Sequence, residues 1–156
     1  MEIAKRSSIK KLKMIDITKI SEEGPYQLFT ANYLEAKKRN QSNIEAISIS
    51  SYNKANAEVE SRFVNLKFID NDEWIFFSNY NSPKSVSFDT HEQISGLFFW
   101  NSINTQIRVK AMIHKTSRAF NNNYFITRSN EKNALAISSD QSMIIDTFDS
   151  VKKNYN

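Results

Sequence analysis

The chain has 156 residues, which is enough for one domain with a substantial core. It contains no cysteine, which excludes disulfides, thiol nucleophiles and cysteine-bound metal sites, and its two histidines are too few for a histidine-rich metal site. Its two glycines, Gly24 and Gly96, lie far apart in the sequence, so a glycine-rich nucleotide-binding loop is also excluded.

The net charge of +4 arises entirely from the N-terminal stretch. Residues 1–13 contain five basic side chains and one acidic side chain, whereas residues 14–156 contain 16 of each. We predict that residues 1–20 form a mobile basic arm and that residues 21–156 form a single domain. Such an arm can contact nucleic acid or a membrane, but the neutral body argues against a nucleic-acid-binding domain.

Hydropathy gives no sign of a membrane protein. No apolar run approaches the ~20 residues that a membrane-spanning helix needs. The basic arm is also not followed by the apolar segment of a secretory signal. The sequence therefore predicts no membrane association and a cytoplasmic location.

The first predicted element is a helix over residues 25–40. Pro25 suits the first position of a helix, and apolar side chains follow it at helical spacing. Alternation of apolar and polar residues then predicts strands over 44–51 and 58–69, with a turn at 52–57 between them.

Three further segments are predicted to be strands: 73–79, 93–100 and 104–116. Ser82 and Pro83 are typical of a helix N-cap and first helical position, so a short helix begins between two of these strands. After residue 116 the spacing is helical, and the predicted helices are 117–129, 131–138 and 142–152. This order of elements indicates a mainly β fold, a small antiparallel β-barrel with peripheral α-helices.

The junction between strand 73–79 and the next helix has the composition of an anion site. Backbone amides at a helix start attract phosphate, and the helix dipole strengthens this attraction. Ser78 and Ser82 can donate hydrogen bonds to the anion. Lys84 supplies a positive charge, and Arg62 on the preceding strand can close the site from the side. A purely structural role for this junction remains the alternative.

A second candidate anion site combines Lys67 with Arg128. Lys67 is a charged residue in an apolar strand, so its side chain either reaches solvent or faces a ligand. Tyr124 lies one helical turn before Arg128 and shares its face. An aromatic ring beside a guanidinium suits a planar phosphorylated ligand, although a core tyrosine followed by a surface arginine gives the same pattern.

These segments together resemble the pyridoxamine 5′-phosphate oxidase family of FMN-binding split barrels. Arg62–Lys67 is similar to the family's R-x-V-x-L-K strand, Phe76–Asn79 to F-Y-T/S-N, and Asn81–Lys84 to G-S-R-K. Leu97–Trp100 followed by Gln106–Val109 is similar to L-x-F-x-W…R-Q-V-x-V, Tyr124–Arg128 to Y-F-x-x-R, and Ser139–Ser142 to S-x-Q-S. The matching segments occur in the family's order and extend over roughly residues 25–152.

The resemblance implies a split β-barrel, an FMN cofactor and a homodimer with FMN at the interface. It also implies that the flavin accepts a hydride equivalent from pyridoxamine or pyridoxine 5′-phosphate, and that molecular oxygen reoxidises it. The implied cofactor-binding residues are Arg62, Val64, Lys67, Phe77, Ser78, Lys84, Gln106, Gln141 and Ser142. The implied substrate-binding residues are Lys67, Tyr124, Arg128 and Lys132. No catalytic side chain is implied, because the flavin performs the redox step.

The chain departs from the family's motifs at four positions. Pro83 stands in place of an arginine, Asn81 in place of a glycine, Phe77 in place of a tyrosine, and Lys132 in place of a serine. The family's C-terminal strands also have no counterpart before residue 156. The alternative hypothesis is therefore a split-barrel protein that binds flavin or another ligand without oxidase activity. A third is nucleic-acid binding through the basic arm.

Overall fold

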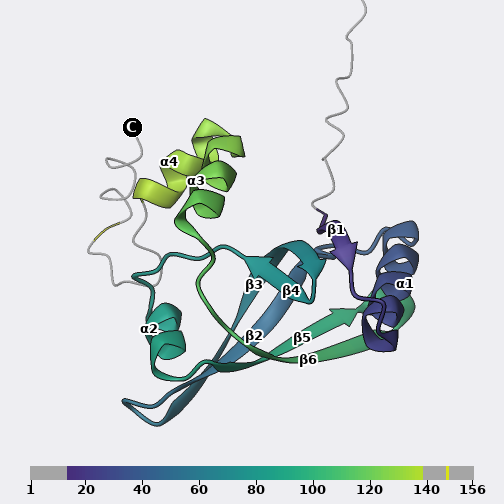
Figure 1. Cartoon of the computed structure of the whole chain (residues 1–156), viewed down its shortest axis with the longest axis horizontal. Helices are drawn as coiled ribbons and strands as arrows, with labels where there is room; N and C mark the ends of the chain where they lie inside the picture. Colours follow the sequence, from purple (N-terminus) through teal and green to yellow (C-terminus); the bar gives the residue numbers. More distant parts are fainter. Residues whose placement is uncertain (1–13, 139–146, 148–156) are drawn as a thin grey trace, which may run out of the picture. The chain divides into compact units, whose positions relative to one another are not determined.

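The computed structural model describes residues 14–138 and residue 147, and Figure 1 labels its elements. The strands are β1 (Asp16–Ile20), β2 (Ala46–Asn53), β3 (Glu58–Asn71), β4 (Glu73–Phe76), β5 (Gln93–Trp100) and β6 (Thr105–Met112). The helices are α1 (Gly24–Lys38), α2 (Pro83–Thr90), α3 (Arg118–Thr127) and α4 (Asn130–Ser138), with one 3₁₀ turn, η1 (Asn101–Ile103). The predicted mainly β class with a few helices is confirmed.

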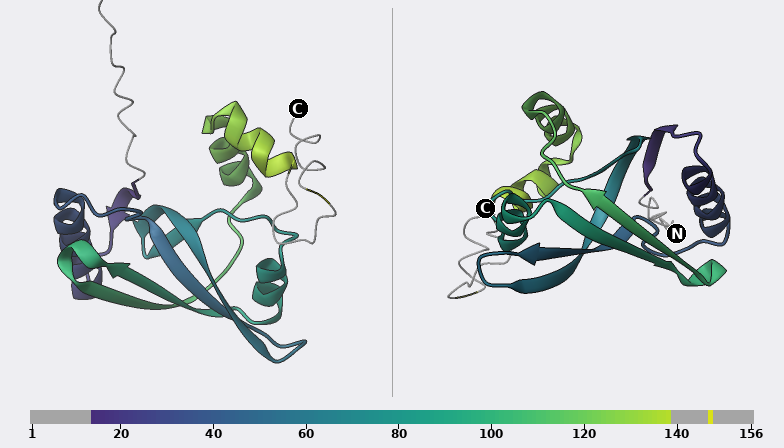
Figure 2. Two further views of the ribbon diagram at one scale, coloured as in Figure 1. Left: turned by 180° about the vertical axis from the view of Figure 1, so that it is seen from behind. Right: turned by 60° about the horizontal axis from the view of Figure 1, so that its bottom comes forward.

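The strands form one sheet in the order β1-β3-β2-β5-β6, and β4 also pairs with β3. β5 and β6 form a hairpin closed by η1, which both views of Figure 2 show. The pairs β2–β5 and β3–β4 are antiparallel, as predicted, whereas β1 runs parallel to β3. Within the described residues the sheet is not closed, because no pairing joins β1 to β6.

β1 is a strand that the sequence analysis does not predict, and it lies in the stretch assigned there to a mobile arm. Its apolar residues, Ile17 and Ile20, are three apart, a spacing that does not fit the two-residue period of a strand. Hydrogen bonds nevertheless connect this segment to α1 and to β3. The amide of Ile15 donates to the hydroxyl of Tyr33 at 3.0 Å, and the hydroxyl of Thr18 donates to the carbonyl of Ile69 at 3.4 Å.

Most other predicted elements are confirmed, with differences at their ends. β4 stops at residue 76, so residues 77–79 belong to the loop before α2. In β3 the alternation breaks where the pairing register with β4 shifts, between Leu66 and Phe68, so that Leu66 and Ile69 are the buried residues there. The predicted helix at 142–152 lies almost entirely outside the described residues. In the described part of the chain, no helix is long and apolar enough to cross a membrane.

The described chain divides into two compact units, and the four longest strands contribute to both. Unit 1 consists of the described parts of residues 1–46, 65–76 and 99–107. Unit 2 consists of the described parts of residues 47–64, 77–98 and 108–156, and it contains α2, α3 and α4.

The core of unit 1 is a cluster of aromatic rings. Phe29 and Tyr33, one turn apart on α1, lie with ring centroids 5.5 and 6.0 Å from that of Trp100. Phe29 also contacts Trp74 on β4 at 4.5 Å. The buried indole of Trp100 donates to the carbonyl of Ile44 at 3.1 Å, so its polar atom has a partner. Phe29 and Tyr33 are therefore the part of the predicted apolar stripe that packs on this cluster. Leu28 and Leu34, which the helical spacing also places in that stripe, are 64% and 57% exposed.

In unit 2 the buried side chains are mainly apolar on β2 and polar around α2. Ile47 and Ile49 are buried on β2, and Gly96 lies opposite Ile49 in the antiparallel register. A Cβ atom at Gly96 would lie 2.7 Å from Cδ1 of Ile47, so glycine permits this close approach. Around α2 the buried side chains are polar: Ser82, Lys84, Ser85 and Ser87.

Candidate functional site

The loop formed by residues 77–82 joins β4 to α2 and positions the candidate site. Asn79 organises it, because its carbonyl accepts the amide of Ser82 at 3.2 Å and the hydroxyl of Ser82 at 2.7 Å. The side-chain oxygen of Asn79 also accepts the amide of Asn81 at 2.8 Å. The hydroxyl of half-buried Ser78 lies 3.5 Å from the same carbonyl, which is the limit of a hydrogen bond. One asparagine therefore fixes the turn into the helix.

Ser82 is the N-cap of α2, as predicted, and Pro83 begins the helix. Its hydroxyl, however, makes no capping bond to the helix. It accepts a hydrogen bond from Nζ of Lys84 at 3.0 Å while it donates to the loop. Ser82 is fully buried and Lys84 is 9% exposed. Ser82 therefore holds the lysine ammonium in place, and does not present a donor at the surface as the sequence suggests.

Two cationic side chains lie near each other beside the start of α2. Burial lowers the pKa of the Lys84 ammonium, and the positive charge of Arg62 lowers this pKa further. Arg62 also forms an ion pair with Glu60, two residues earlier on β3. Val64, two residues later on the same strand, is half-buried. One carboxylate beside two cations leaves a net positive charge, which a bound anion would neutralise. We call this group of Arg62, Ser82 and Lys84 the cation cradle.

The first residue of the loop packs on α3. The rings of Phe77 and Tyr124 stack, with centroids 3.7 Å apart and planes within 7°. Phe120, one turn earlier on α3, lies nearly parallel to Phe77 at 6.2 Å. Burial raises the pKa of the Tyr124 phenol, and the charge of Arg128 opposes this rise. Tyr124 and Arg128 are therefore within electrostatic reach of each other.

Arg128 follows the last residue of α3 and is its C-cap. Its guanidinium donates to the backbone carbonyl of Lys132 at 2.9 Å and lies 5.7 Å from the ring centre of Phe125. The side chain of Lys132 is exposed. The contact between Arg128 and Lys132 thus uses the lysine backbone and leaves the ammonium at the surface.

The other predicted site residues fall elsewhere. Lys67 on β3 and Gln106 on β6 belong to unit 1, where Lys67 is half-buried and Gln106 is exposed. Gln141 and Ser142 lie outside the described residues. The structure brings together Arg62, Ser82 and Lys84, and separately Phe77, Tyr124 and Arg128, all within unit 2.

Sequence reasoning missed several residues that build this region. Glu60 could have been found, because charges two residues apart on a strand share a face. Asn79 could also have been found, because its contacts lie within three residues and asparagine commonly organises such turns. Asn121 could not, since its contact with Tyr80 depends on the tertiary fold. Asn121 donates to the hydroxyl of Tyr80 at 3.1 Å, across 41 residues of sequence.

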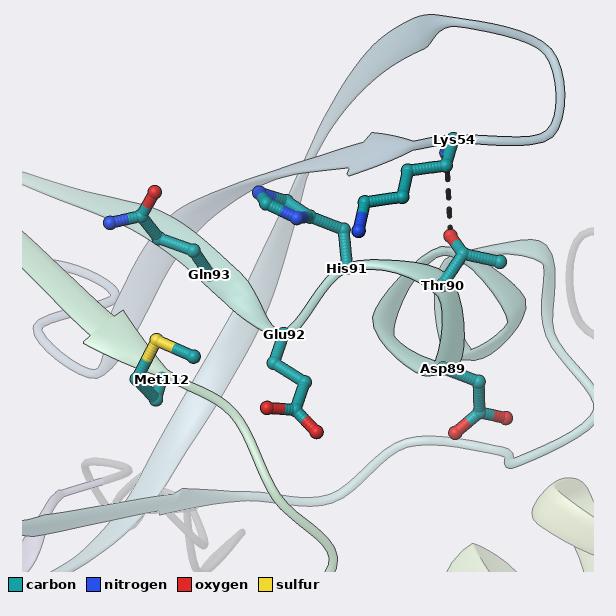
Figure 3. Close-up of a pocket in the computed structure, with 7 residues that line it drawn as sticks. All are labelled: Lys54, Asp89, Thr90, His91, Glu92, Gln93 and Met112. Atoms are coloured by element: carbon teal, nitrogen blue, oxygen red, sulfur yellow. Dashed lines mark hydrogen bonds between the residues drawn. The ribbon is translucent and has the colours of Figure 1, made fainter.

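A surface pocket of about 300 Å³ lies at the C-terminal end of α2 (Figure 3). It is lined by residues 89–93 together with Lys54 and Met112. In Figure 3 the side chains of Lys54 and His91 lie on one side, and the carboxylate of Glu92 lies on the other. No predicted site residue lines this pocket, and its charges are mixed. Within the part of the chain that is described, no cluster of acidic or histidine side chains suits a metal ion.

Comparison with known proteins gives clear relatives by sequence, although no protein-family model matches the chain. It is 33% identical over 129 residues to the pyridoxine/pyridoxamine 5′-phosphate oxidase of Colwellia psychrerythraea, a match that covers 83% of this chain and 59% of that protein. The enzyme of the same name from Caulobacter vibrioides is 31% identical over 123 residues, which are 79% of this chain and 55% of that protein. The chain thus spans little more than half the length of these curated relatives.

Two solved structures share the fold. PhzG from Burkholderia lata 383, in complex with tetrahydrophenazine-1-carboxylic acid, matches with a TM-score of 0.79 and 19% identity over 84% of this chain and 64% of that one. A pyridoxamine 5′-phosphate oxidase-related, FMN-binding protein from Nostoc punctiforme matches with a TM-score of 0.63 and 11% identity over 83% of this chain and 72% of that one. The predicted split-barrel fold class is thereby confirmed.

Proposed function

Because the chain belongs to the family of the pyridoxine/pyridoxamine 5′-phosphate oxidases, we propose that its cation cradle binds the phosphate of FMN. The observation that carries this proposal is the burial of Lys84 beside Ser82, with the positive charge of Arg62 within electrostatic reach. Two like charges in a partly buried site repel each other and lose solvation. A phosphate monoester carries about −1.5 to −2 charges at pH 7 and would relieve both effects.

The donors present fit such a phosphate. Arg62 offers a planar guanidinium that can bind two oxygens at once, and Lys84 offers a point charge held by Ser82. Ser78 adds a hydroxyl whose bond to the Asn79 carbonyl is too long to hold it strongly. When bound, the flavin would supply the redox chemistry, by accepting a hydride equivalent from the substrate.

The remaining side chains would bind and orient the ring systems. Val64 and Phe77 flank the cradle in sequence and are assigned to the cofactor, together with Gln106, Gln141, Ser142 and Lys67. These assignments derive from the motifs. A homodimer with FMN at the interface is part of the same proposal, and Gln141 and Ser142 would reach the flavin from the partner subunit or from the far rim of the site.

The proposed substrate is a phosphorylated aromatic compound of the pyridoxamine or pyridoxine 5′-phosphate type. Tyr124, Arg128 and Lys132, with Lys67, would hold its phosphate. A phenol is protonated at neutral pH and can donate a hydrogen bond, and burial, which raises the pKa of Tyr124, favours this form further. The oxidised carbon would be the aminomethyl or hydroxymethyl carbon, with molecular oxygen as the final electron acceptor.

The first test is the visible absorption spectrum of the purified protein, before and after addition of FMN and desalting. We expect a retained flavin band. Lys84→Gln should weaken FMN binding about tenfold or more, because a charge-assisted hydrogen bond is worth about 1.5–3 kcal/mol. Lys110→Gln, on the exposed face of β6, is the matched control and should bind FMN like the wild type. A colourless protein that cannot retain FMN would overturn the proposal.

A second candidate function is flavin or ligand binding without oxidase turnover. Two observations favour it. Pro83 supplies neither the cation nor the backbone N–H that the family's arginine would offer at the start of α2. Glu60 already neutralises part of the charge of Arg62. Hydrogen peroxide formation by the FMN-loaded protein with pyridoxamine 5′-phosphate separates the two functions, because only the oxidase produces it.

A further inference from the structure

The loop at residues 77–82 contacts both the cation cradle and α3. Through Ser82 it holds Lys84 in the cation cradle. Through Phe77 and Tyr80 it contacts α3, by the stacked ring of Tyr124 and by a hydrogen bond from Asn121. The same six-residue turn, organised by Asn79, therefore joins the proposed phosphate site to the helix that carries the proposed substrate residues.

The amide of Asn121 is itself oriented. Its oxygen accepts the hydroxyl of Thr116 at 2.7 Å, so its nitrogen is the atom that reaches the hydroxyl of Tyr80 at 3.1 Å. On the segment before α3, Nζ of Lys115 lies 5.6 Å from the ring centre of Tyr80 and pairs with Asp89 of α2 at 2.9 Å. Tyr80 is thus held between two side chains from around the start of α3.

α3 depends on such contacts because none of its residues is buried. Phe125 and Ile126 on this helix are 39% and 78% exposed. An element with few buried apolar contacts is readily displaced from its native position. The stack on Phe77 and the bond to Tyr80 are therefore contacts that help to fix where Tyr124 and Arg128 stand.

We propose that Phe77 and Tyr80 are positioning residues that couple the two sites, so that an anion in the cation cradle strengthens binding of the phosphorylated substrate at Tyr124 and Arg128. The physical reason is a shared ordering cost. An anion bound in the cation cradle would order the loop and, with it, the residues on which α3 packs. The second ligand would then lose less conformational entropy when it binds. This inference rests on the proposed function, since it takes FMN and the substrate as the two ligands.

The test measures the dissociation constant of FMN with and without saturating 4-deoxypyridoxine 5′-phosphate, a probe that lacks the oxidisable group. In the wild type we expect the probe to tighten FMN binding roughly fivefold or more, and FMN to tighten probe binding by the same factor. Tyr80→Phe removes the acceptor of the Asn121 bond, and Phe77→Leu removes the stack. Both should lower the coupling factor clearly below its wild-type value, whatever each variant's own FMN affinity is.

Two further variants separate positioning from general damage. Phe77→Tyr keeps an aromatic ring in the stack and should restore the coupling. Tyr52→Phe removes a phenol hydroxyl from a ring that packs against His91, and should leave the coupling unchanged. Thermal unfolding without ligands identifies any variant that is merely unstable. If Phe77→Leu does not fold, Tyr80→Phe decides the question alone.

The outcomes distinguish the two proposals. A wild-type protein that does not bind FMN overturns the proposed function and this inference with it. A wild-type protein that binds FMN but shows no coupling overturns this inference alone. Coupling that survives unchanged in both Tyr80→Phe and Phe77→Leu also overturns this inference and leaves the proposed function standing.

Discussion

The two units bury different chemistry. Unit 1 buries mainly aromatic and aliphatic side chains, and the indole of Trp100 and the phenol of Tyr33 both have hydrogen-bond partners. Its one buried carboxyl group among the described residues is that of Glu45. Unit 2 buries a lysine and several serines around α2, and its helix α3 has no buried residue. Apolar burial with satisfied polar atoms stabilises a fold, whereas a buried cation destabilises it unless an anion compensates. The contrast places the aromatic core in unit 1 and the cation cradle in unit 2.

The largest expected effect on stability concerns the aromatic core of unit 1. Trp100 is 1% exposed and contacts Phe29 and Tyr33, so Trp100→Ala should lower the free energy of unfolding by about 3–5 kcal/mol. Phe99→Ala is the matched control, since Phe99 is 61% exposed on the same strand, and its effect should stay within about 0.5 kcal/mol. Chemical denaturation measures both. Equal effects at the two positions would contradict the assignment of the aromatic cluster as the core of unit 1.

A smaller effect is expected at the close contact in unit 2. Gly96→Ala places a methyl group against Cδ1 of Ile47 and should destabilise the protein by about 1–2 kcal/mol. Ile47→Val removes that Cδ1 atom, so the double variant should recover part of the loss. The two changes should therefore be non-additive in a double-mutant cycle. Strict additivity would show that the two side chains do not compete for the same space.

The smallest and most informative effect concerns Lys84. Lys84→Met keeps the length of the side chain and removes its charge, so the ligand-free protein should become more stable by about 1 kcal/mol while FMN binding is lost. Stability and binding would then change in opposite directions at one position. A loss of both would mean that Lys84 is a structural residue that pairs within the fold.

The pH dependence of stability carries the same information. The pKa of Lys84 is lowered in the folded protein, so the folded state releases this proton at a lower pH than the unfolded chain does. The penalty of the buried charge is fully present below the folded pKa and disappears as pH rises past the unfolded value. The free energy of unfolding should therefore rise with pH between the folded and the unfolded pKa in the wild type, and this contribution should be absent from Lys84→Met.

The sequence predicts the parts of this molecule that depend on local periodicity and capping. The helix α1 with its buried Phe29 and Tyr33, the alternation in β2, and the start of α2 at Pro83 all follow from spacing or from residue type. The same spacing also places Leu28 and Leu34 in the apolar stripe, but both are exposed. The sequence does not predict β1, because its two isoleucines are three residues apart and its partner, β3, lies about 50 residues later. Pairing over such a distance leaves no trace in the local pattern.

The same distinction applies to the candidate site. The sequence singles out Arg62, Ser82 and Lys84 because cationic and hydroxyl side chains near a helix start are typical of anion sites. It assigns the wrong task to the hydroxyl of Ser82, which is used inside the loop, because burial is decided by the tertiary fold. The contacts of Phe77 and Tyr80 with α3 were equally out of reach, since both join residues about 40 positions apart or more.

The parallel pairing of β1 with β3 has a consequence for association between chains. β1 covers the backbone of β3 along residues 68–71. An uncovered strand edge offers its amides and carbonyls to any other extended chain and is a common starting point for aggregation. A protein that begins at residue 14 would keep β1 on this edge of β3, whereas one that begins at residue 21 would leave the edge uncovered. β1 itself then forms the edge of the sheet. Its short length, its lysine and the break in its pairing register are features that disfavour association at a strand edge.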